Sequence, residues 1–197
     1  MVRYDDGMGG SRKGVRQRLQ HAALELYVER GFERTTAADI AALAGVTERT
    51  YFRHFPDKRE VLFDGEAALA ASLADAVLTA PPGLPPLPTL LAAFLSAAAI
   101  FERDWALKER RYRIVAATPE LHERELSKWA HLTEALASAL EQRGVRPSVA
   151  SLAAGCGTAV LSRARLEWLA GSQRGYPALL NDAFAELGLL IEANKDE

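Results

Sequence analysis

The sequence predicts an all-α protein, and three observations lead to this. Ala and Leu dominate the apolar residues, and both are good helix formers. Runs of Val, Ile and Thr, which favour strands, are almost absent. Apolar residues instead recur at three- and four-residue spacing between Gly and Pro breaks, the pattern of amphipathic helices. We expect about nine helices.

Composition excludes several classes of protein. The 197 residues contain one cysteine, Cys156, so a disulfide framework is ruled out and a reducing cytoplasm is expected. The first 14 residues carry two acids and four glycines without an apolar core, which predicts a disordered leader over 1–13 rather than a signal peptide. The apolar run over 90–101 is too short for a membrane span.

The charge is unevenly distributed, although the formal net charge is only -2. Residues 11–60 hold ten Lys and Arg against seven Asp and Glu, a balance of +3. Residues 61–197 hold thirteen against seventeen, a balance of -4. A mildly basic head on an acidic body suits a protein with one nucleic-acid-binding end.

The first three helices are marked by local signals. Apolar spacing predicts a helix over 14–30 that Gly31 ends. Thr36 can cap a second, short helix, which Gly45 breaks. Thr47 can cap a third helix that runs to about His54.

The remaining chain is predicted to be helical outside a few breaks. A long helix should start at Asp57 or Lys58 and reach Ala80 without interruption. The segment 81–88, with five prolines in eight residues, predicts a stiff non-helical connector. A bend is expected near Asp104. The further helices are expected over 89–103, 105–117, 119–143, 148–170 and 177–193.

Two short helices joined at Gly45 predict a helix-turn-helix. Small residues lie where the helices would meet, and polar residues would face outward from the second helix. We therefore expect a DNA-binding domain over 14–60 and a ligand-binding and dimerisation domain over 61–197.

The continuation TTAADIAALAGVTERTYFRHFPDKREVLF resembles the DNA-binding domain of the TetR family of transcriptional regulators over about residues 15–65. The shared features are a Thr opening helix two, a Gly-Val turn, an aromatic-rich segment ending in His-Phe, and a Lys before an apolar pair. This resemblance implies that Thr36 and Thr50 donate to phosphates, that His54 and Lys58 bind the DNA backbone, and that side chains of the third helix contact base edges. The predicted DNA-binding residues are Thr36, Thr47, Glu48, Arg49, Thr50, Tyr51, Phe52, Arg53, His54 and Lys58.

Several of these residues have a second interpretation. Tyr51 is also a core candidate. The alternative for Glu48 is that it only favours the start of its helix, and the alternative for Arg49 is a solvated surface position. Phe52 departs from the family pattern, because the family usually has a hydroxyl-bearing aromatic there. Its contact would be apolar or lost.

The C-terminal half contains no catalytic or metal-binding pattern. His122 and His131 are nine residues apart, which does not place them on one helix face as a metal pair. Cys156 lies between two glycines and is expected to be a buried, inert core thiol. We expect no enzyme activity, no metal and no cofactor.

Two apolar stripes in the last two helices predict a homodimer, with packing inside one chain as the alternative. A two-fold dimer would carry two recognition helices to successive major grooves, about 34–36 Å apart. The predicted dimerisation residues are Leu152, Cys156, Val160, Leu180, Phe184, Leu187 and Ile191.

The ligand site is predicted from aromatic residues, each of which is also a core candidate. The stretch RYRIVAATPELHERELSKW, residues 111–129, resembles TetR-type regulators with an acyl-CoA-binding C-terminal domain. An acyl ligand would then place its anionic end at Arg103, Arg110, Arg111 or Arg113. The predicted ligand residues are Phe101, Trp105, Arg111, Tyr112, Trp129 and Trp168.

These features together predict a ligand-responsive regulator that binds a palindromic DNA operator, most simply a repressor released by a small molecule. An all-α enzyme and an interaction module that does not bind DNA are the alternatives. An enzyme would need a convergent polar site, and an interaction module would not need Thr36, Arg49, His54 and Lys58 together.

Overall fold

The computed structural model describes residues 12–192, and within this range it confirms the all-α prediction, with ten α-helices and one short 3-10 helix. Two compact units make up the chain. The N-terminal unit runs to Asp64 and includes Arg113–Leu121, and the C-terminal unit comprises Gly65–Tyr112 and the chain from His122 onward. The leader predicted over 1–13 falls almost entirely outside the described residues, and the domain boundary predicted after residue 60 stays a prediction.

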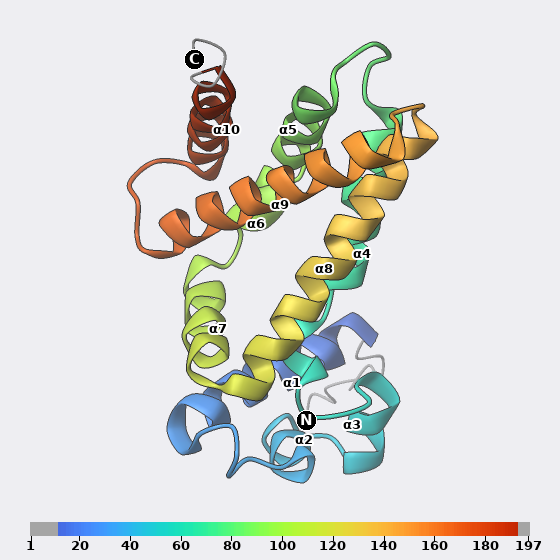
Figure 1. The fold of residues 1–197 in the computed structure, drawn as a ribbon. Helices are drawn as coiled ribbons and strands as arrows, with labels where there is room; N and C mark the ends of the chain where they lie inside the picture. Colours follow the sequence, from blue (N-terminus) through green and yellow to red (C-terminus); the bar gives the residue numbers. More distant parts are fainter. Residues whose placement is uncertain (1–11, 193–197) are drawn as a thin grey trace, which may run out of the picture. The chain divides into compact units, whose positions relative to one another are not determined.

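The N-terminal unit contains α1 (Arg12–Arg30), α2 (Ala37–Leu43), α3 (Glu48–His54) and the 3-10 helix η1 (Glu60–Phe63) (Figure 1). Side chains from all four helices share one small core, so the short α2 and α3 are stabilised by packing rather than by length. The larger buried side chains of this unit include Leu19, Tyr27, Phe32, Ile40, Tyr51, Phe55, Leu62 and Phe63.

The long helix predicted from Asp57 or Lys58 to Ala80 is wrong, because the chain breaks between η1 and α4 (Glu66–Thr79). Asp64 has extended backbone angles, and Gly65 has φ 85°, in the left-handed region. An α-helix cannot pass through a residue with positive φ, and glycine adopts that conformation without steric cost. The apolar spacing continues across the break, which is why the sequence pattern concealed it.

The proline connector is shorter than predicted, since α5 (Pro86–Ser96) already begins inside it. Pro85 is the N-cap residue, and Pro86 and Pro88 lie in the first turn. First-turn residues have no intrahelical acceptor for an N–H, so proline loses no hydrogen bond there.

The single helix predicted over 89–103 is wrong, because Ala97 separates α5 from a short α6 (Ala98–Glu102). The helices after Asp104 agree with the predicted segments to within a few residues. The expected bend is confirmed at Asp104, which has φ 55°. The helices after this bend are α7 (Trp105–Ala117), α8 (Pro119–Gln142), α9 (Pro147–Leu169) and α10 (Tyr176–Glu192).

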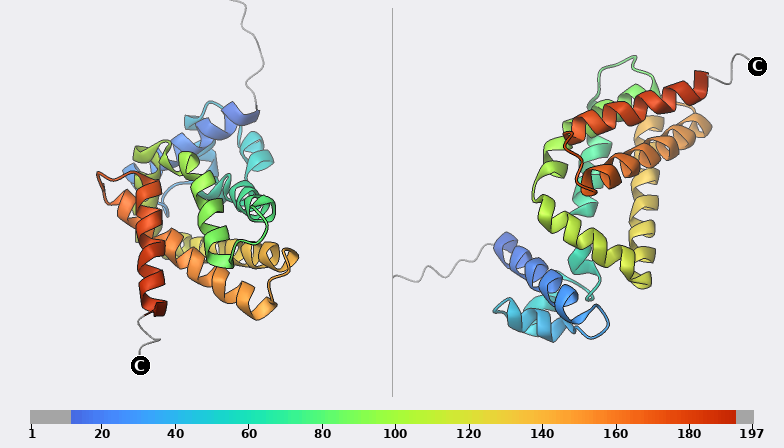
Figure 2. Two further views of the ribbon diagram at one scale, coloured as in Figure 1. Left: turned by 90° about the horizontal axis from the view of Figure 1, so that it is seen from above. Right: turned by 90° about the vertical axis from the view of Figure 1, so that its left-hand side faces the viewer.

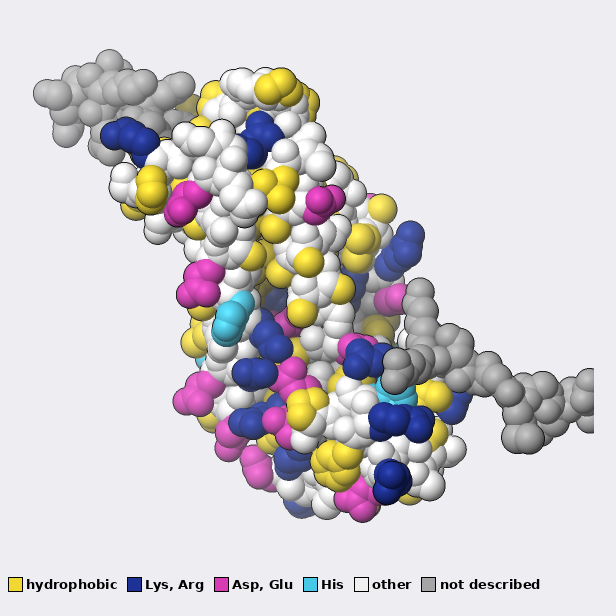
Figure 3. Space-filling model, turned by 90° about the vertical axis from the view of Figure 1, so that its right-hand side faces the viewer, with side chains coloured by type: hydrophobic (Ala, Val, Ile, Leu, Met, Phe, Trp, Pro, Cys, Tyr) yellow, Lys and Arg dark blue, Asp and Glu magenta, His cyan; other side chains and the backbone are white. Residues whose placement is uncertain are grey.

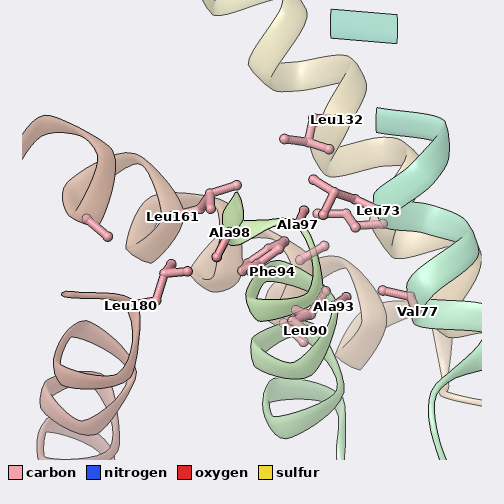
Figure 4. Close-up of a cluster of buried hydrophobic side chains, with 14 of the residues drawn as sticks. Leu73, Val77, Leu90, Ala93, Phe94, Ala97, Ala98, Leu132, Leu161 and Leu180 are labelled. Carbon is pink, nitrogen blue, oxygen red and sulfur yellow. The ribbon is translucent and has the colours of Figure 1, made fainter. Parts of the chain in front are cut away.

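The core of the C-terminal unit lies where α4, α5, α8, α9 and α10 meet (Figure 4). α9 and α10 run side by side, as the right-hand view of Figure 2 shows. A Cβ added to Gly157 of α9 would lie 2.8 Å from Leu90 Cδ1, so this glycine lets α5 approach α9 closely. Arg143 donates to the Ala80 and Pro81 carbonyls at 2.7 and 2.8 Å and fixes the end of α4. Among the described helices, none combines the length and apolar character needed to cross a bilayer.

Candidate nucleic-acid interface

The turn between α2 and α3 is built by Gly45. Its φ of 68° lets the chain reverse after Ala44. The Gly45 N–H donates to the Ala42 carbonyl at 3.1 Å, and the Val46 N–H donates to the Ala41 carbonyl at 2.9 Å. This pair of bonds is a Schellman motif, which satisfies the last carbonyls of α2 and fixes the direction in which α3 starts.

The start of α2 is held by a capping box. The Asp39 N–H donates to Thr36 Oγ1 at 3.1 Å, and the Thr36 N–H donates to Asp39 Oδ2 at 2.9 Å. The Thr36 hydroxyl also donates to Asp39 Oδ2 at 2.6 Å. These bonds to Thr36 lower the pKa of the exposed Asp39 carboxyl below its usual value.

The start of α3 is held by Thr47. The Thr50 N–H donates to Thr47 Oγ1 at 3.1 Å, and the two hydroxyl oxygens lie 3.0 Å apart. Both N-caps predicted from the sequence are therefore present. Each short helix of the motif has a fixed start, and the side chains that follow it are positioned.

One face of α3 is exposed and carries four of the predicted DNA-binding residues. Glu48, Arg49 and Arg53 are exposed, and Phe52 retains 50% of its accessible surface. Positions 48, 49, 52 and 53 follow the i, i+1, i+4, i+5 spacing of a single helix face. An exposed aromatic between two arginines presents apolar and cationic groups together.

Tyr51 lies on the opposite face of α3, so it does not belong with the exposed residues predicted to bind DNA. It is 0% exposed, and its hydroxyl donates to the Asp57 carbonyl at 3.1 Å. Burial raises the pKa of its phenol well above the usual value. Tyr51 is a core residue and presents no surface to DNA. His54 is also buried, so it offers little surface to a phosphate.

Lys58 is engaged with the end of α1. Its Nζ donates to the Phe32 carbonyl at 2.9 Å and lies 4.1 Å from the centroid of the Phe32 ring. The Tyr27 hydroxyl donates to the Lys58 carbonyl at 2.5 Å. The phosphate contact predicted for Lys58 stays a prediction, and it would compete with the Phe32 carbonyl.

Two arginines of α1 were missed by the sequence analysis. Arg16 Nη2 donates to the His54 carbonyl at 2.9 Å, and Arg18 Nε donates to the Ala44 carbonyl at 3.2 Å. Each guanidinium thus binds a carbonyl at the C-terminal end of a helix, where a cation is favoured. The only sequence signal was a basic first helix, which does not identify a partner.

Local side chains rather than overall charge have to provide DNA affinity. Figure 3 shows one face of the molecule, on which basic, acidic and hydrophobic side chains are interspersed. With a formal net charge of -2, the protein has no general attraction to a polyanion.

The predicted ligand residues form two separate groups in the C-terminal unit. In the first, the Phe101 ring stacks on Tyr176 at 5.0 Å, Trp168 meets Tyr176 edge-on at 6.0 Å, and Trp105 Nε1 donates to the Trp168 carbonyl at 3.2 Å. This group packs α6, α9 and α10 together. Phe101 and Trp168 belong to the core or pack against it.

The second group surrounds Arg165, a residue that the sequence analysis missed. The Arg165 guanidinium lies 5.8 Å from the ring centroid of Tyr112 and 5.3 Å from that of Trp129. Arg165 Nη1 also donates to Glu125 Oε1 at 3.3 Å.

Arg111, predicted to receive an anion, is already paired. Its guanidinium donates to Glu66 Oε1 at 2.5 Å and to Glu125 Oε1 at 3.5 Å. Glu66, Arg111, Glu125 and Arg165 together form what we name the ionic cluster. Burial raises the pKa of Glu66, while Arg111 acts to lower it. Arg103, Arg110 and Arg113, the other predicted anion acceptors, are exposed.

Some of the predicted dimerisation residues are exposed, and others are buried within the chain. Leu152 and Cys156 are exposed on α9, so the prediction of Cys156 as a buried core thiol is wrong. Cys156 lies on the face of α9 away from the core, which Ala153, Ala154 and Gly157 face instead. Val160 and Leu180 are buried within the chain, Phe184 packs on Phe94 with ring centroids 6.1 Å apart, and Leu187 is half-buried. The Ile191 side chain lies outside the described residues.

Family models match both parts of the chain. The model "Bacterial regulatory proteins, tetR family" matches residues 19–64, and the model "MftR C-terminal domain" matches residues 84–189. Among the described residues, no group of three or more His, Cys, Asp or Glu could hold a metal ion.

Two curated relatives are regulators. The HTH-type transcriptional regulator TcmR of Streptomyces glaucescens is 34% identical over 116 residues, which cover 54% of this chain and only 50% of TcmR. The putative mycofactocin biosynthesis transcriptional regulator MftR of Mycobacterium tuberculosis is 24% identical over 140 residues, 71% of each chain.

Solved structures share the fold. FadR of Thermus thermophilus, a TetR family transcriptional repressor in complex with lauroyl-CoA, is 28% identical, with a TM-score of 0.54 over 90% of this chain and 93% of its own. NalD of Pseudomonas aeruginosa is 21% identical, with a TM-score of 0.60 over 89% and 97%, and supports the fold alone. The resemblance to the TetR family is confirmed: this chain belongs to the TetR family of bacterial regulatory proteins, has an MftR-type C-terminal domain, and is a transcriptional regulator rather than an enzyme.

Proposed function

We propose that this protein is a homodimeric repressor that binds a palindromic operator through α3 and leaves it when a small molecule binds the C-terminal unit. The observation that carries the proposal is the exposed face of α3. Glu48, Arg49, Phe52 and Arg53 project from a helix whose start is fixed by Thr47. An α-helix of this kind fits the major groove.

Each side chain of this face has a chemical role at a base edge or phosphate. Arg49 can donate two hydrogen bonds to guanine O6 and N7, and Arg53 can bind a base or a phosphate. Glu48 can accept from cytosine N4, and Phe52 can contact the thymine methyl group. Of Thr47 and Thr50, the hydroxyl that is not the donor in their mutual contact can donate to a phosphate oxygen and help to fix the register of α3 on the duplex. The Thr36 hydroxyl would have to leave Asp39 Oδ2 to make such a contact.

The dimer is supported by an apolar surface on α9 and α10. Leu152 is 72% exposed and Leu190 is 69% exposed. Gly155, Cys156 and Ala159 are exposed on the same face of α9 as Leu152, and such small residues allow close approach of a second helix. Exposed apolar surface of this kind marks an interaction site, and a two-fold dimer would place two copies of α3 in successive major grooves.

The effector site is proposed to lie in the C-terminal unit. FadR of Thermus thermophilus, the 28% identical neighbour, was solved with lauroyl-CoA, which makes an acyl derivative one candidate class here. An effector lowers operator affinity only if it binds the DNA-bound and free conformations with different affinities. A coupling of about 1–3 kcal/mol would change operator affinity about 5–150-fold.

Equilibrium DNA binding tests this proposal. Fluorescence anisotropy would compare duplexes from the intergenic DNA upstream of the protein's own gene with a shuffled duplex of equal length. We expect Arg49→Ala to weaken operator binding by about 1–3 kcal/mol relative to the shuffled duplex. Arg163→Ala, which removes an exposed arginine of the C-terminal unit, is the charge-matched control. A uniform loss on all duplexes would make Arg49 a phosphate contact, and a lack of any sequence preference across upstream fragments would reject operator binding there.

A further inference from the structure

The ionic cluster brings together charged side chains from four helices of the C-terminal unit. Glu66 is the first residue of α4, Arg111 lies on α7, Glu125 on α8 and Arg165 on α9. The contacts run in sequence from Glu66 through Arg111 and Glu125 to Arg165. Glu125 is buried, Arg111 and Arg165 are mostly buried, and Glu66 is 30% exposed, so the cluster reaches from the interior of the C-terminal unit to a partly exposed end at Glu66.

The charges of the ionic cluster balance. Two carboxylates face two guanidinium groups, and each guanidinium already contacts a carboxylate. Lys128 also acts to lower the pKa of Glu66, but it is not free. An anionic ligand would be a third negative group at the site and would compete with Glu66 and Glu125 for the same donors.

Two buried atoms of the cluster have no hydrogen-bond partner among the described residues. They are Glu66 Oε2, which is an acceptor, and Arg165 Nε, whose N–H is a donor. Buried polar atoms in folded proteins are normally hydrogen-bonded, so these two mark a place for a partner. A hydroxyl group both donates and accepts, whereas a carboxylate only accepts and an ammonium group only donates. The unpaired donor and acceptor therefore favour an uncharged hydroxyl.

Aromatic rings flank the Arg165 end of the cluster. The Arg165 guanidinium lies over both Trp129 and Tyr112, and both rings are only half-buried. Aromatic side chains beside a few placed polar groups are typical of sites for flat, mainly apolar ligands. Hydrogen bonds would orient the hydroxyl, and ring contacts would hold the apolar body.

We propose that the ionic cluster is the polar end of the effector site and takes an uncharged, hydroxyl-bearing aromatic ligand, which donates to Glu66 Oε2 and accepts from Arg165 Nε. The proposal rests on the proposed function as a ligand-responsive regulator. Glu66 directly follows Gly65, the left-handed glycine at which the two units divide. Ligand contact at Glu66 therefore acts on the first residue of the helix that leads out of the DNA-binding unit.

Three small probes test the ligand chemistry on the full-length protein. 2-Naphthol is uncharged at neutral pH and carries a hydroxyl, 2-naphthoate is an anion of similar shape, and naphthalene has no polar group. Calorimetric titration should give the highest affinity for 2-naphthol, by about tenfold over either of the others, the worth of one hydrogen bond to a charged group. Tighter binding of 2-naphthoate, equal binding of naphthalene, or no binding of 2-naphthol would overturn the proposal.

Variants assign the binding to the ionic cluster. Arg165→Lys keeps the positive charge and removes the Nε–H, and we expect it to weaken 2-naphthol binding about tenfold. Arg163→Lys, two residues away and exposed on the same helix, should leave binding unchanged. Glu66→Gln is the second test if Arg165→Lys does not fold, and it should also weaken 2-naphthol binding. Equal affinity in all variants would place the ligand elsewhere.

Operator binding measured without any probe separates this inference from the proposed function. Sequence-specific DNA binding together with no 2-naphthol binding would reject only the ligand inference. Absence of sequence-specific DNA binding would reject the regulator proposal, whatever the probes do.

Discussion

Arg16 of α1 donates from Nη2 to the carbonyl of His54 at 2.9 Å, and His54 is the last residue of α3. The same guanidinium pairs with the Asp64 carboxylate and lies 5.0 Å from the centroid of the Phe55 ring. One side chain therefore ties the first helix to the end of the recognition helix and to the end of the N-terminal unit.

Replacing Arg16 should destabilise the N-terminal unit. We expect Arg16→Ala to lower the free energy of unfolding by about 1–3 kcal/mol, because a helix-terminal carbonyl loses a charged donor. Water screens the ion pair with Asp64, since Arg16 is 40% exposed, so most of the loss should come from the His54 bond and ring packing. Urea denaturation followed by circular dichroism measures it. Arg34→Ala, at an exposed arginine bonded to the Arg30 carbonyl, should cost less than about 0.5 kcal/mol. Equal losses in both variants would contradict the role given to Arg16.

Gly45 should tolerate no side chain without a conformational cost. A Cβ there would meet no atom within 4 Å, so the whole effect of Gly45→Ala would come from its φ of 68°. We expect a loss of about 1–2 kcal/mol in stability. Gly14→Ala inside α1, where there is likewise no atom within 4 Å, should instead be neutral or stabilising by up to about 1 kcal/mol. Gly45→Ala should therefore lower the melting temperature, whereas Gly14→Ala should leave it unchanged or raise it. Similar melting temperatures for the two variants would contradict a conformational cost at Gly45.

Acid should weaken the start of α2 through Asp39. Its pKa is lowered in the folded protein by the bonds to Thr36, so the unfolded chain binds a proton first as the pH falls. The contribution of Asp39 is therefore present above its unfolded value of 3.8 and is lost as the pH falls through the lower folded value. Melting temperatures measured from neutral pH down to that range should fall more in the wild type than in Asp39→Asn. Parallel profiles would show that the capping box contributes no pH dependence.

The proposed dimer can be broken at its apolar face. Leu152→Glu places a charge on the exposed face of α9 and should convert the dimer to a monomer. An unpaired charge buried in an apolar interface costs roughly several kcal/mol. Light scattering after size exclusion gives the mass. Leu126→Glu is the matched control, because Leu126 is 55% exposed on α8, outside the proposed interface. A monomeric wild type, or dimers in both variants, would contradict an interface on α9.

Local signals account for what the sequence predicted well. Both N-caps and the Gly45 turn depend on residues within a few positions of each other, so Thr36, Thr47 and Gly45 could be assigned without the fold. The break at Gly65 was missed because apolar spacing continues through it, and only the backbone angle separates a helical glycine from a left-handed one.

Contacts between distant segments could not be predicted. Glu66, Arg111, Glu125 and Arg165 come from four helices, α4, α7, α8 and α9, and meet only in the folded chain. Charged residues far apart in sequence give no signal of such pairing. Cys156 was misplaced, and Tyr51 was left open between core and DNA contact, for a related reason. Helical spacing gives the angle between side chains around a helix, but which face is covered depends on what packs against it.

Phe52 stands where the TetR family usually has a hydroxyl-bearing aromatic. Its ring is half-exposed and held edge-on against the buried Tyr51 ring, with centroids 5.5 Å apart. Phe52→Tyr adds a hydroxyl that can donate to a phosphate, so it should strengthen binding to operator and shuffled duplexes alike. If the ring contacts a thymine methyl group, Phe52→Ala should weaken binding to the operator by about 1–3 kcal/mol more than binding to the shuffled duplex. Fluorescence anisotropy on both duplexes measures the two effects, and an equal loss on both for Phe52→Ala would limit Phe52 to a role in placing α3.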